Sequence, residues 1–188
     1  MTKPIHPKND GRRAFCGALL ASMAIDSTSF AYAINKDIPM SKPSNKPMTL
    51  WQALAQLSQQ IPFSKEGVEK VLAAKLTQTA VQGNEYFWFY ESESVALADG
   101  ATLKVDLRIK REGVHPGFLV INLSGSCIKI AEVRSHFEGL QITDHPRGRS
   151  LDDVTSYTAA LSWGALSFSF KERQPDCLSS VAFKPKKL

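Results

Sequence analysis

The chain has 188 residues, 43% of them hydrophobic, and a formal net charge of +5. This is one domain's worth of chain, and it is long enough to bury a real core. The basic residues concentrate near the two ends and do not gather with aromatic residues into a stripe, which argues against a nucleic-acid-binding protein.

The first 33 residues have the pattern of an export signal. Four basic residues precede an apolar stretch over 14–25, namely Lys3, Lys8, Arg12 and Arg13. An apolar stretch of 12 residues is shorter than the ~20 that span a bilayer, so no transmembrane anchor is expected. The alternative is an amphipathic first helix, but this stretch has no polar face. We expect cleavage near Ala33 and a periplasmic or secreted mature protein.

The start of this segment resembles the twin-arginine signal of bacteria, Ser/Thr-Arg-Arg-x-Phe-Leu-Lys. Arg12, Arg13 and Phe15 match that pattern, whereas the residues at 11, 16 and 17 depart from it. The resemblance implies a bacterial source and export in a folded state, a route often used by cofactor proteins. The general secretory route stays open as well.

Cleavage would change both the charge and the cysteine count. It removes four basic and two acidic residues. The mature chain then has 19 lysines and arginines against 16 aspartates and glutamates, a net charge of +3. It also removes Cys16, so that Cys127 and Cys177 remain as a pair in an oxidising compartment. We expect a disulfide between them. The alternatives, a redox pair or metal ligands, lack a Cys-x-x-Cys motif and zinc-site spacing.

The mature chain opens with a predicted flexible linker, residues 34–48, which contains three prolines. A single domain is expected over 49–188. Thr49 is a good N-cap for a first helix that Pro62 ends, and Ser64 is a good N-cap for a second helix. The apolar residues of the first helix, from Leu50 to Ile61, recur at helical spacing.

Strand patterns follow the two helices. An aromatic run covers 85–90, residues 103–109 alternate between apolar and polar, and 118–123 form a third apolar segment. A short helix over 130–137 then precedes strand-like segments at 156–160, 161–170 and 178–183. The pattern predicts an α+β domain, in which helices pack to one side of an antiparallel sheet.

The two halves of this pattern can be superposed as weak repeats of helix, strand, strand and strand, residues 64–124 and 126–184. This order of elements resembles the tandem helix–strand repeat domains of the β-lactamase inhibitory protein and of small outer-membrane assembly lipoproteins. The lipid-bearing cysteine of the lipoproteins is missing here. The resemblance therefore implies a fold and transfers no binding residue.

No reactive constellation stands out in the mature chain. Its histidines are His115, His136 and His145, and none has a nucleophile or metal-ligand setting around it. A Gly-rich phosphate loop and an HExxH helix are also missing, so we predict no cofactor and no metal site. The acidic residues that flank the strands are read as solvating groups.

Two groups of residues are candidates for binding a partner. The stretch 143–153 contains His145, Arg147 and Arg149, whose guanidinium groups suit a carboxylate or phosphate. Those arginines either recognise an acidic partner surface or a cell-wall carboxylate, or pair with Asp144, Asp152 or Asp153 to hold the loop. In the aromatic run, Trp88 and Tyr90 either pack under the first helix or anchor a protein partner. That helix would supply the cover through Trp51, Leu54 and Leu57.

The sequence thus favours an exported, non-catalytic binding module, for example a periplasmic inhibitor or immunity protein that binds a protein partner. One alternative is a cofactor- or ligand-binding enzyme or carrier of the cell envelope. Another is an envelope assembly factor.

Overall fold

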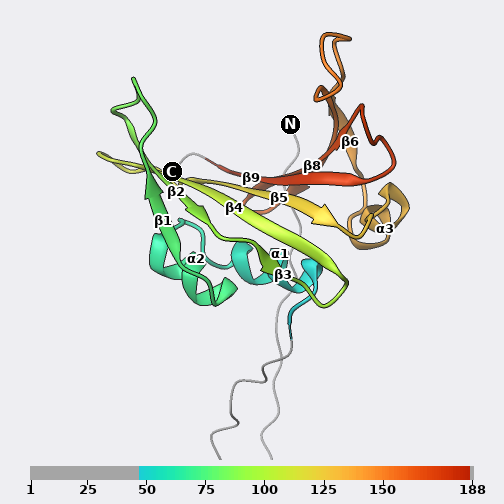
Figure 1. The fold of residues 1–188 in the computed structure, drawn as a ribbon. Helices are drawn as coiled ribbons and strands as arrows, with labels where there is room; N and C mark the ends of the chain where they lie inside the picture. Colours follow the sequence, from blue (N-terminus) through green and yellow to red (C-terminus); the bar gives the residue numbers. More distant parts are fainter. Residues whose placement is uncertain (1–46, 187–188) are drawn as a thin grey trace, which may run out of the picture. The chain divides into compact units, whose positions relative to one another are not determined.

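The computed structural model describes residues 47–186, and within them it has three helices and nine strands (Figure 1). In chain order these are α1 (Leu50–Ser58), α2 (Lys65–Leu72), β1 (Leu76–Thr79), β2 (Phe87–Ser92), β3 (Val95–Ala96), β4 (Ala101–Lys110), β5 (Phe118–Gly125), α3 (Ile130–His136), β6 (Gln141–Asp144), β7 (Val154–Leu161), β8 (Gly164–Lys171) and β9 (Leu178–Pro185). The predicted export signal, 1–33, and the predicted linker as far as residue 46 lie outside the described residues. None of the helices between 47 and 186 has the length and apolar composition needed to cross a membrane.

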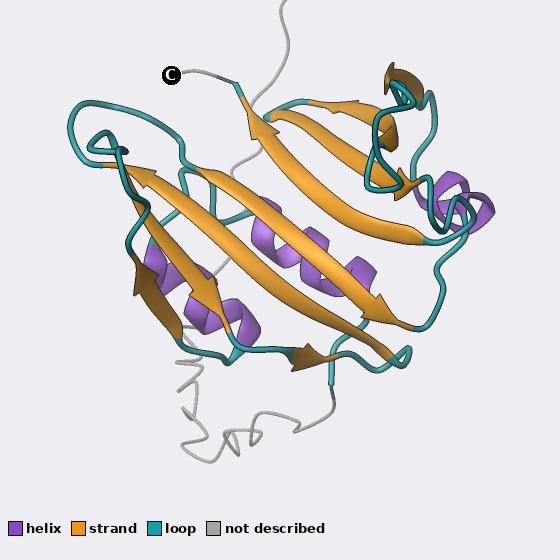
Figure 2. Ribbon diagram, turned by 45° about the horizontal axis from the view of Figure 1, so that its top comes forward, coloured by secondary structure: helices purple, strands orange, loops and turns teal. Residues whose placement is uncertain are grey.

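All nine strands belong to one antiparallel sheet with the order β1-β2-β4-β5-β9-β8-β7-β6, and β3 lies beside β4. The helices cover one face of this sheet, and Figure 2 shows α1 and α2 behind the strands. The predicted α+β class with an antiparallel sheet is confirmed. The structure also shows that the two halves of the chain form one continuous sheet.

The strand order is symmetric about the β5–β9 pair. On one side the sheet continues through β4, β2 and β1, and on the other through β8, β7 and β6. The superposition of 64–124 on 126–184 pairs α2 with α3, β4 with β8 and β5 with β9, and these elements hold equivalent places in the topology. The structure adds β1 and β6 at the two outer edges and the short strand β3 beside β4.

The first helix begins where the sequence predicts and ends earlier. Thr49 and Gln52 form a capping box, in which the Thr49 hydroxyl accepts the Gln52 N–H and the Gln52 side chain accepts the Thr49 N–H. The helix ends at Ser58 with Gln59 as its C-cap, so Pro62 does not end it, and Ile61 lies beyond it.

The other two helices follow the predicted pattern closely. Ser64 accepts the Gly67 N–H at the start of α2, and Val68 and Leu72 are buried. The third helix ends at His136, one residue before its predicted limit, and buries Val133.

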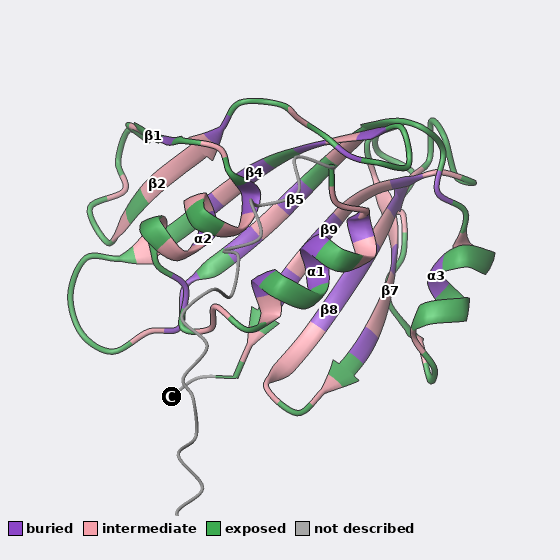
Figure 3. Ribbon diagram, turned by 90° about the horizontal axis from the view of Figure 1, so that it is seen from below, coloured by how far each residue is buried: buried purple, intermediate pink, exposed green. Residues whose placement is uncertain are grey.

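The core lies between the helices and one face of the sheet. Along β4, Leu103, Val105 and Leu107 are fully buried, as their alternation predicts, and the intervening side chains face the other side (Figure 3). The core continues into the second half through β8 and β9, where Phe168 and Phe183 are also buried. One hydrophobic cluster therefore spans both halves of the sheet.

The predicted disulfide between Cys127 and Cys177 is present, with 4.9 Å between the two Cα atoms. It joins the segment between β5 and α3 to the residue before β9. A backbone hydrogen bond of 2.9 Å from Leu178 N to Ile128 O lies beside it. Together these bonds hold the start of β9 near the end of β5.

Replacing both cysteines, Cys127→Ser with Cys177→Ser, should lower the free energy of unfolding by about 2 to 4 kcal/mol, because the bond closes a loop of 50 residues. Urea denaturation of the oxidised protein and of the double variant measures the difference. An unchanged midpoint and slope would contradict a stabilising role for the bond.

Candidate functional site: the open face of the sheet

The sheet face opposite the helices is bare within the described part of the chain, and we call it the open face. The polar side chains of β4 lie on it, since they alternate with the buried ones. The β1–β2 loop (80–86) and the β6–β7 loop (145–153) rise on this side, away from α1 and α2 (Figure 1). The open face is thus a broad surface with a projecting loop near each end.

An aromatic cluster of Phe87, His115 and Phe118 lies on the first half of the open face. The strand register places Phe87 opposite Lys110 and Phe118 opposite Arg108, which puts both rings on the side away from the core. The His115 ring centroid is 4.6 Å from that of Phe118 and 5.6 Å from that of Phe87. Although the rings pack together, Phe118 keeps 40% of its surface exposed.

The imidazole of His115 has a defined donor and acceptor arrangement. Its Nδ1 accepts the Gly117 N–H at 2.9 Å, so in the neutral ring the proton is on Nε2. The turn thereby fixes the orientation of the ring within the aromatic cluster. His115 is half-buried and contacts two phenylalanines.

Four of the charged side chains beside the aromatic cluster form two ion pairs. Lys104 Nζ lies 2.7 Å from Glu91 Oε2, and Arg108 lies 2.8 Å from Asp106 Oδ2. These pairs are largely exposed, so they contribute little to the free energy of folding. Lys110, opposite Phe87, adds a positive charge that forms no ion pair with the described residues.

Small hydroxyl side chains cover the open face in the second half of the sheet, on β6, β7 and β8. They are joined across the strands by hydrogen bonds, with Ser156 2.9 Å from Ser169, Thr158 3.0 Å from Ser167 and Thr143 2.7 Å from Thr158. Ser167 is only 2% exposed although no helix covers it. These short side chains therefore lie deeper than the longer side chains and loops around them.

The arginine loop, residues 144–153, is held through its backbone. Asp153 Oδ2 accepts the N–H groups of Arg147 and Arg149, each at 3.0 Å. Two further backbone bonds, Glu172 N to Asp153 O and Arg173 N to Leu151 O, tie the loop to the β8–β9 turn. The loop is thus fixed without the use of either guanidinium group.

Neither guanidinium group of Arg147 and Arg149 forms an ion pair with a residue in the described part of the chain. The neighbouring Asp152 pairs instead with Lys171, at 3.1 Å, and with Arg173. Of the two interpretations offered by the sequence, this geometry leaves the guanidinium groups of the arginine loop free to meet an external group.

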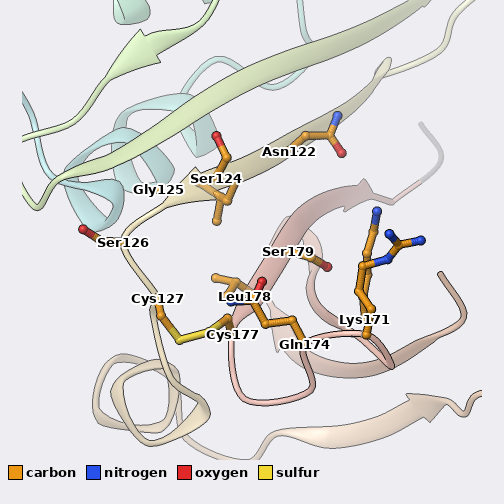
Figure 4. Close-up of a pocket in the computed structure, with 12 residues that line it drawn as sticks. Asn122, Ser124, Gly125, Ser126, Cys127, Lys171, Gln174, Cys177, Leu178 and Ser179 are labelled. Carbon is orange, nitrogen blue, oxygen red and sulfur yellow. A yellow bond between two sulfur atoms is a disulfide. The ribbon is translucent and has the colours of Figure 1, made fainter. Parts of the chain in front are cut away.

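A cavity of about 320 Å³ opens where β5 and β9 separate. The ladder between these strands stops at the pair Asn122 and Ser180, and beyond it the strands diverge toward the disulfide (Figure 4). We call this opening the fork. Its polar lining comes from both halves of the sheet and comprises Asn122, Ser124, Ser126, Lys171, Arg173, Gln174 and Ser179.

The predicted binding residues do not form one site. His145, Arg147 and Arg149 share the arginine loop, whereas Trp88 and Tyr90 belong to β2 in the other half. The register puts Trp88 opposite Ile109 and Tyr90 opposite Leu107, so both side chains lie on the helix-bearing side of the sheet.

The cover of these two aromatics differs from the expected one. Lys65 of α2 lies 5.7 Å from the Tyr90 ring centroid, and Arg111 stacks over Trp88 at 4.0 Å. Trp51 of α1 stacks on His136 at the other end of the domain, with 4.0 Å between the ring centroids. The expectation that Trp51 covers the aromatic strand was therefore wrong.

Sequence reasoning missed Phe87 and Phe118 as the aromatic residues that face the open side of the sheet, whereas the predicted Trp88 is 38% exposed on the helix-bearing side. The alternation within the aromatic run already separates Phe87 from Trp88 and Tyr90. Choosing between the two sets requires the register with β4, because only that register shows which set shares a face with Leu107.

The three histidines among residues 47–186 lie in three separate environments. His115 belongs to the aromatic cluster, and His136 stacks on Trp51. His145 lies in the arginine loop, where its backbone N–H donates to Asp144 Oδ1 at 3.0 Å. Within residues 47–186, no three His, Cys, Asp or Glu side chains are grouped so as to hold a metal ion.

Comparison with known proteins returned no relatives. No protein-family model matches the chain, and no similarity to a curated protein or to a solved structure reaches significance. The resemblance to the inhibitory protein and the lipoproteins in element order stays a prediction.

The bonds to Asp153 predict how the arginine loop responds to acid. The Arg149 N–H, followed by that of Arg147, lowers the pKa of Asp153 below its ordinary value. A carboxylate with a lowered pKa stabilises the folded loop when the pH is above the ordinary pKa of the group. That stabilisation is lost as the pH falls through the folded-state pKa. In an NMR titration the amide protons of Arg147 and Arg149 should therefore shift together, with a midpoint below ~3.9.

Asp153→Asn should abolish that shared transition, since the amide side chain does not titrate. A common midpoint at or above ~3.9 in the unmodified protein would contradict the proposed bonds.

Proposed function

We propose that the chain is an exported, non-catalytic binding module that contacts a protein partner through the open face. An inhibitor or immunity protein that caps a toxin or hydrolase in the bacterial envelope is the concrete form of this proposal. The observation that carries it is the bare sheet face, on which the aromatic cluster and the arginine loop are presented near opposite ends.

The size of the open face fits a protein interface. Eight adjacent strands at ~4.8 Å spacing, with a mean length of seven residues at ~3.4 Å per residue, give roughly 900 Å². A stable protein–protein interface buries about 800 Å² on each partner. One side of the sheet is therefore large enough for a complete interface.

The side chains on this face also suit an interface. Aromatic residues and arginine carry much of the binding energy in protein complexes, especially when the scaffold already holds them in place. The packing of Phe118 against His115 and the backbone bonds of the arginine loop supply that order before any partner arrives. Binding then costs little additional side-chain and loop entropy.

The proposed compartment rests on two features. The basic and apolar pattern of residues 1–33 supports export, and the Cys127–Cys177 bond is compatible with an oxidising compartment. The same features support the periplasm or the exterior of a bacterial cell as the place where the partner is met.

The test is to capture a partner from the envelope fraction with tagged mature protein, identify it, and measure its affinity with purified components. Phe118→Ser and the pair Arg147→Glu with Arg149→Glu should each weaken binding at least about tenfold, which corresponds to ~1.4 kcal/mol. The reason is that each change removes an exposed anchor without disturbing the core.

A charge-matched control is Lys70→Glu with Lys129→Glu, two exposed residues at the ends of α2 and α3. It should leave the affinity unchanged. If the control variant loses binding while the open-face variants retain it, the partner uses the helix side and the proposal fails.

A further inference from the structure

The fork is an opening in the middle of an otherwise continuous sheet. The ladder between β5 and β9 runs from the pair Leu119–Phe183 to the pair Asn122–Ser180 and ends there. The outer neighbours of both strands stay paired beyond this point, since β4 follows β5 to Gly125 and β8 follows β9 to Leu178. The opening is thus a local separation of two strands inside an intact sheet.

The far end of the fork is closed covalently. The disulfide and the Leu178 N to Ile128 O bond join the two strands' extensions, as Figure 4 shows for Cys127 and Cys177. The cavity is therefore bounded by a backbone ladder at one end and a disulfide at the other. Such an opening cannot close by extending the ladder without moving the bonded segment.

The lining of the fork is polar and carries positive charge. Its lining residues include Lys171 and Arg173, and no carboxylate belongs to the described residues that line it. Hydroxyl and amide groups of Ser124, Asn122 and Gln174 provide neutral hydrogen-bonding partners beside these cations. This set of groups suits an anion that also presents polar atoms.

Lys171 and Arg173 already bind the carboxylate of Asp152, a residue that does not line the fork. Lys171 Nζ lies 3.1 Å from Asp152 Oδ1, and the Arg173 guanidinium bonds to Oδ2 of the same group. The separation of the two cations therefore matches the two oxygens of one carboxylate. Because the Asp152 side chain is 54% exposed, this pairing contributes little stability and can be exchanged.

We propose that the fork is a carboxylate-binding site, in which Lys171 and Arg173 exchange Asp152 for the carboxylate of a ligand. The ligand is either an acidic side chain of a protein or a free carboxylic acid. This inference goes beyond the proposed function, since binding of a small carboxylate requires no protein partner.

Asp152 acts in this account as an internal competitor. The loop that carries it is held by backbone bonds and by Asp153, so loss of its charge leaves the loop in place. Removing that charge frees both cations for the ligand. The account thus predicts a gain of binding from the loss of a charged residue, which a merely structural ion pair would not produce.

The test is an NMR titration of the mature, oxidised protein with glutamate capped by N-acetyl and C-amide groups. Saturable shifts should appear in the amides of residues 122–126 and 177–179, and capped glutamine should cause none. Asp152→Asn should tighten binding at least about threefold, and Lys171→Met with Arg173→Met should weaken it about tenfold or more. The matched control, Lys104→Met with Arg108→Met, removes two cations elsewhere on the open face and should change nothing.

Succinate and an acidic tripeptide distinguish the two sources of the carboxylate. Tighter binding of succinate supports a free acid, and tighter binding of the tripeptide supports a protein side chain. Absence of saturable shifts in both the unmodified protein and Asp152→Asn would overturn the site. Unchanged affinity in Asp152→Asn would overturn the exchange, and tighter binding of inorganic phosphate would overturn the ligand class.

Discussion

The short ladder between β5 and β9 joins two sets of strands, β1 to β5 and β6 to β9, into one sheet. It consists of four residue pairs, from Leu119 with Phe183 to Asn122 with Ser180, and the buried side chains of both strands belong to the common core. Because these are the last strands of their respective halves, the topology is symmetric about this junction. The width of the open face and the position of the fork both follow from where this ladder begins and ends.

Placement of all three helices on one side leaves the opposite side of the sheet uncovered by any described helix. The alternating residues of β4 show the division, since Leu103, Val105 and Leu107 enter the core while the charged residues between them face outward. On the outward side the protein has few groups suited to covalent chemistry and many suited to contact. A pre-ordered aromatic cluster, a backbone-fixed arginine loop and a polar opening at the junction are the features on which we base the proposed recognition of a partner.

Much of the fold can be predicted from the sequence because strong local signals mark it. Thr49 and Ser64 cap the first two helices, the alternation from 103 to 109 defines β4, and Cys127 and Cys177 form the expected bond. The outer strands escape prediction because β1 has one buried residue and β6 has none, so neither carries an apolar pattern. The site is harder still. The fork depends on where a ladder stops, and the role of Asp153 depends on whether it meets a backbone N–H or a guanidinium group.

Hydroxyl-radical footprinting of the protein alone and in complex with its partner tests the central claim most directly, because oxidisable aromatic residues lie on both sides of the sheet. The account predicts that Phe87 and Phe118, on the open face, lose reactivity in the complex. Trp51, which contacts α3 on the helix side, should react equally in both states. Protection of Trp51 with unchanged oxidation of Phe118 would contradict recognition through the open face.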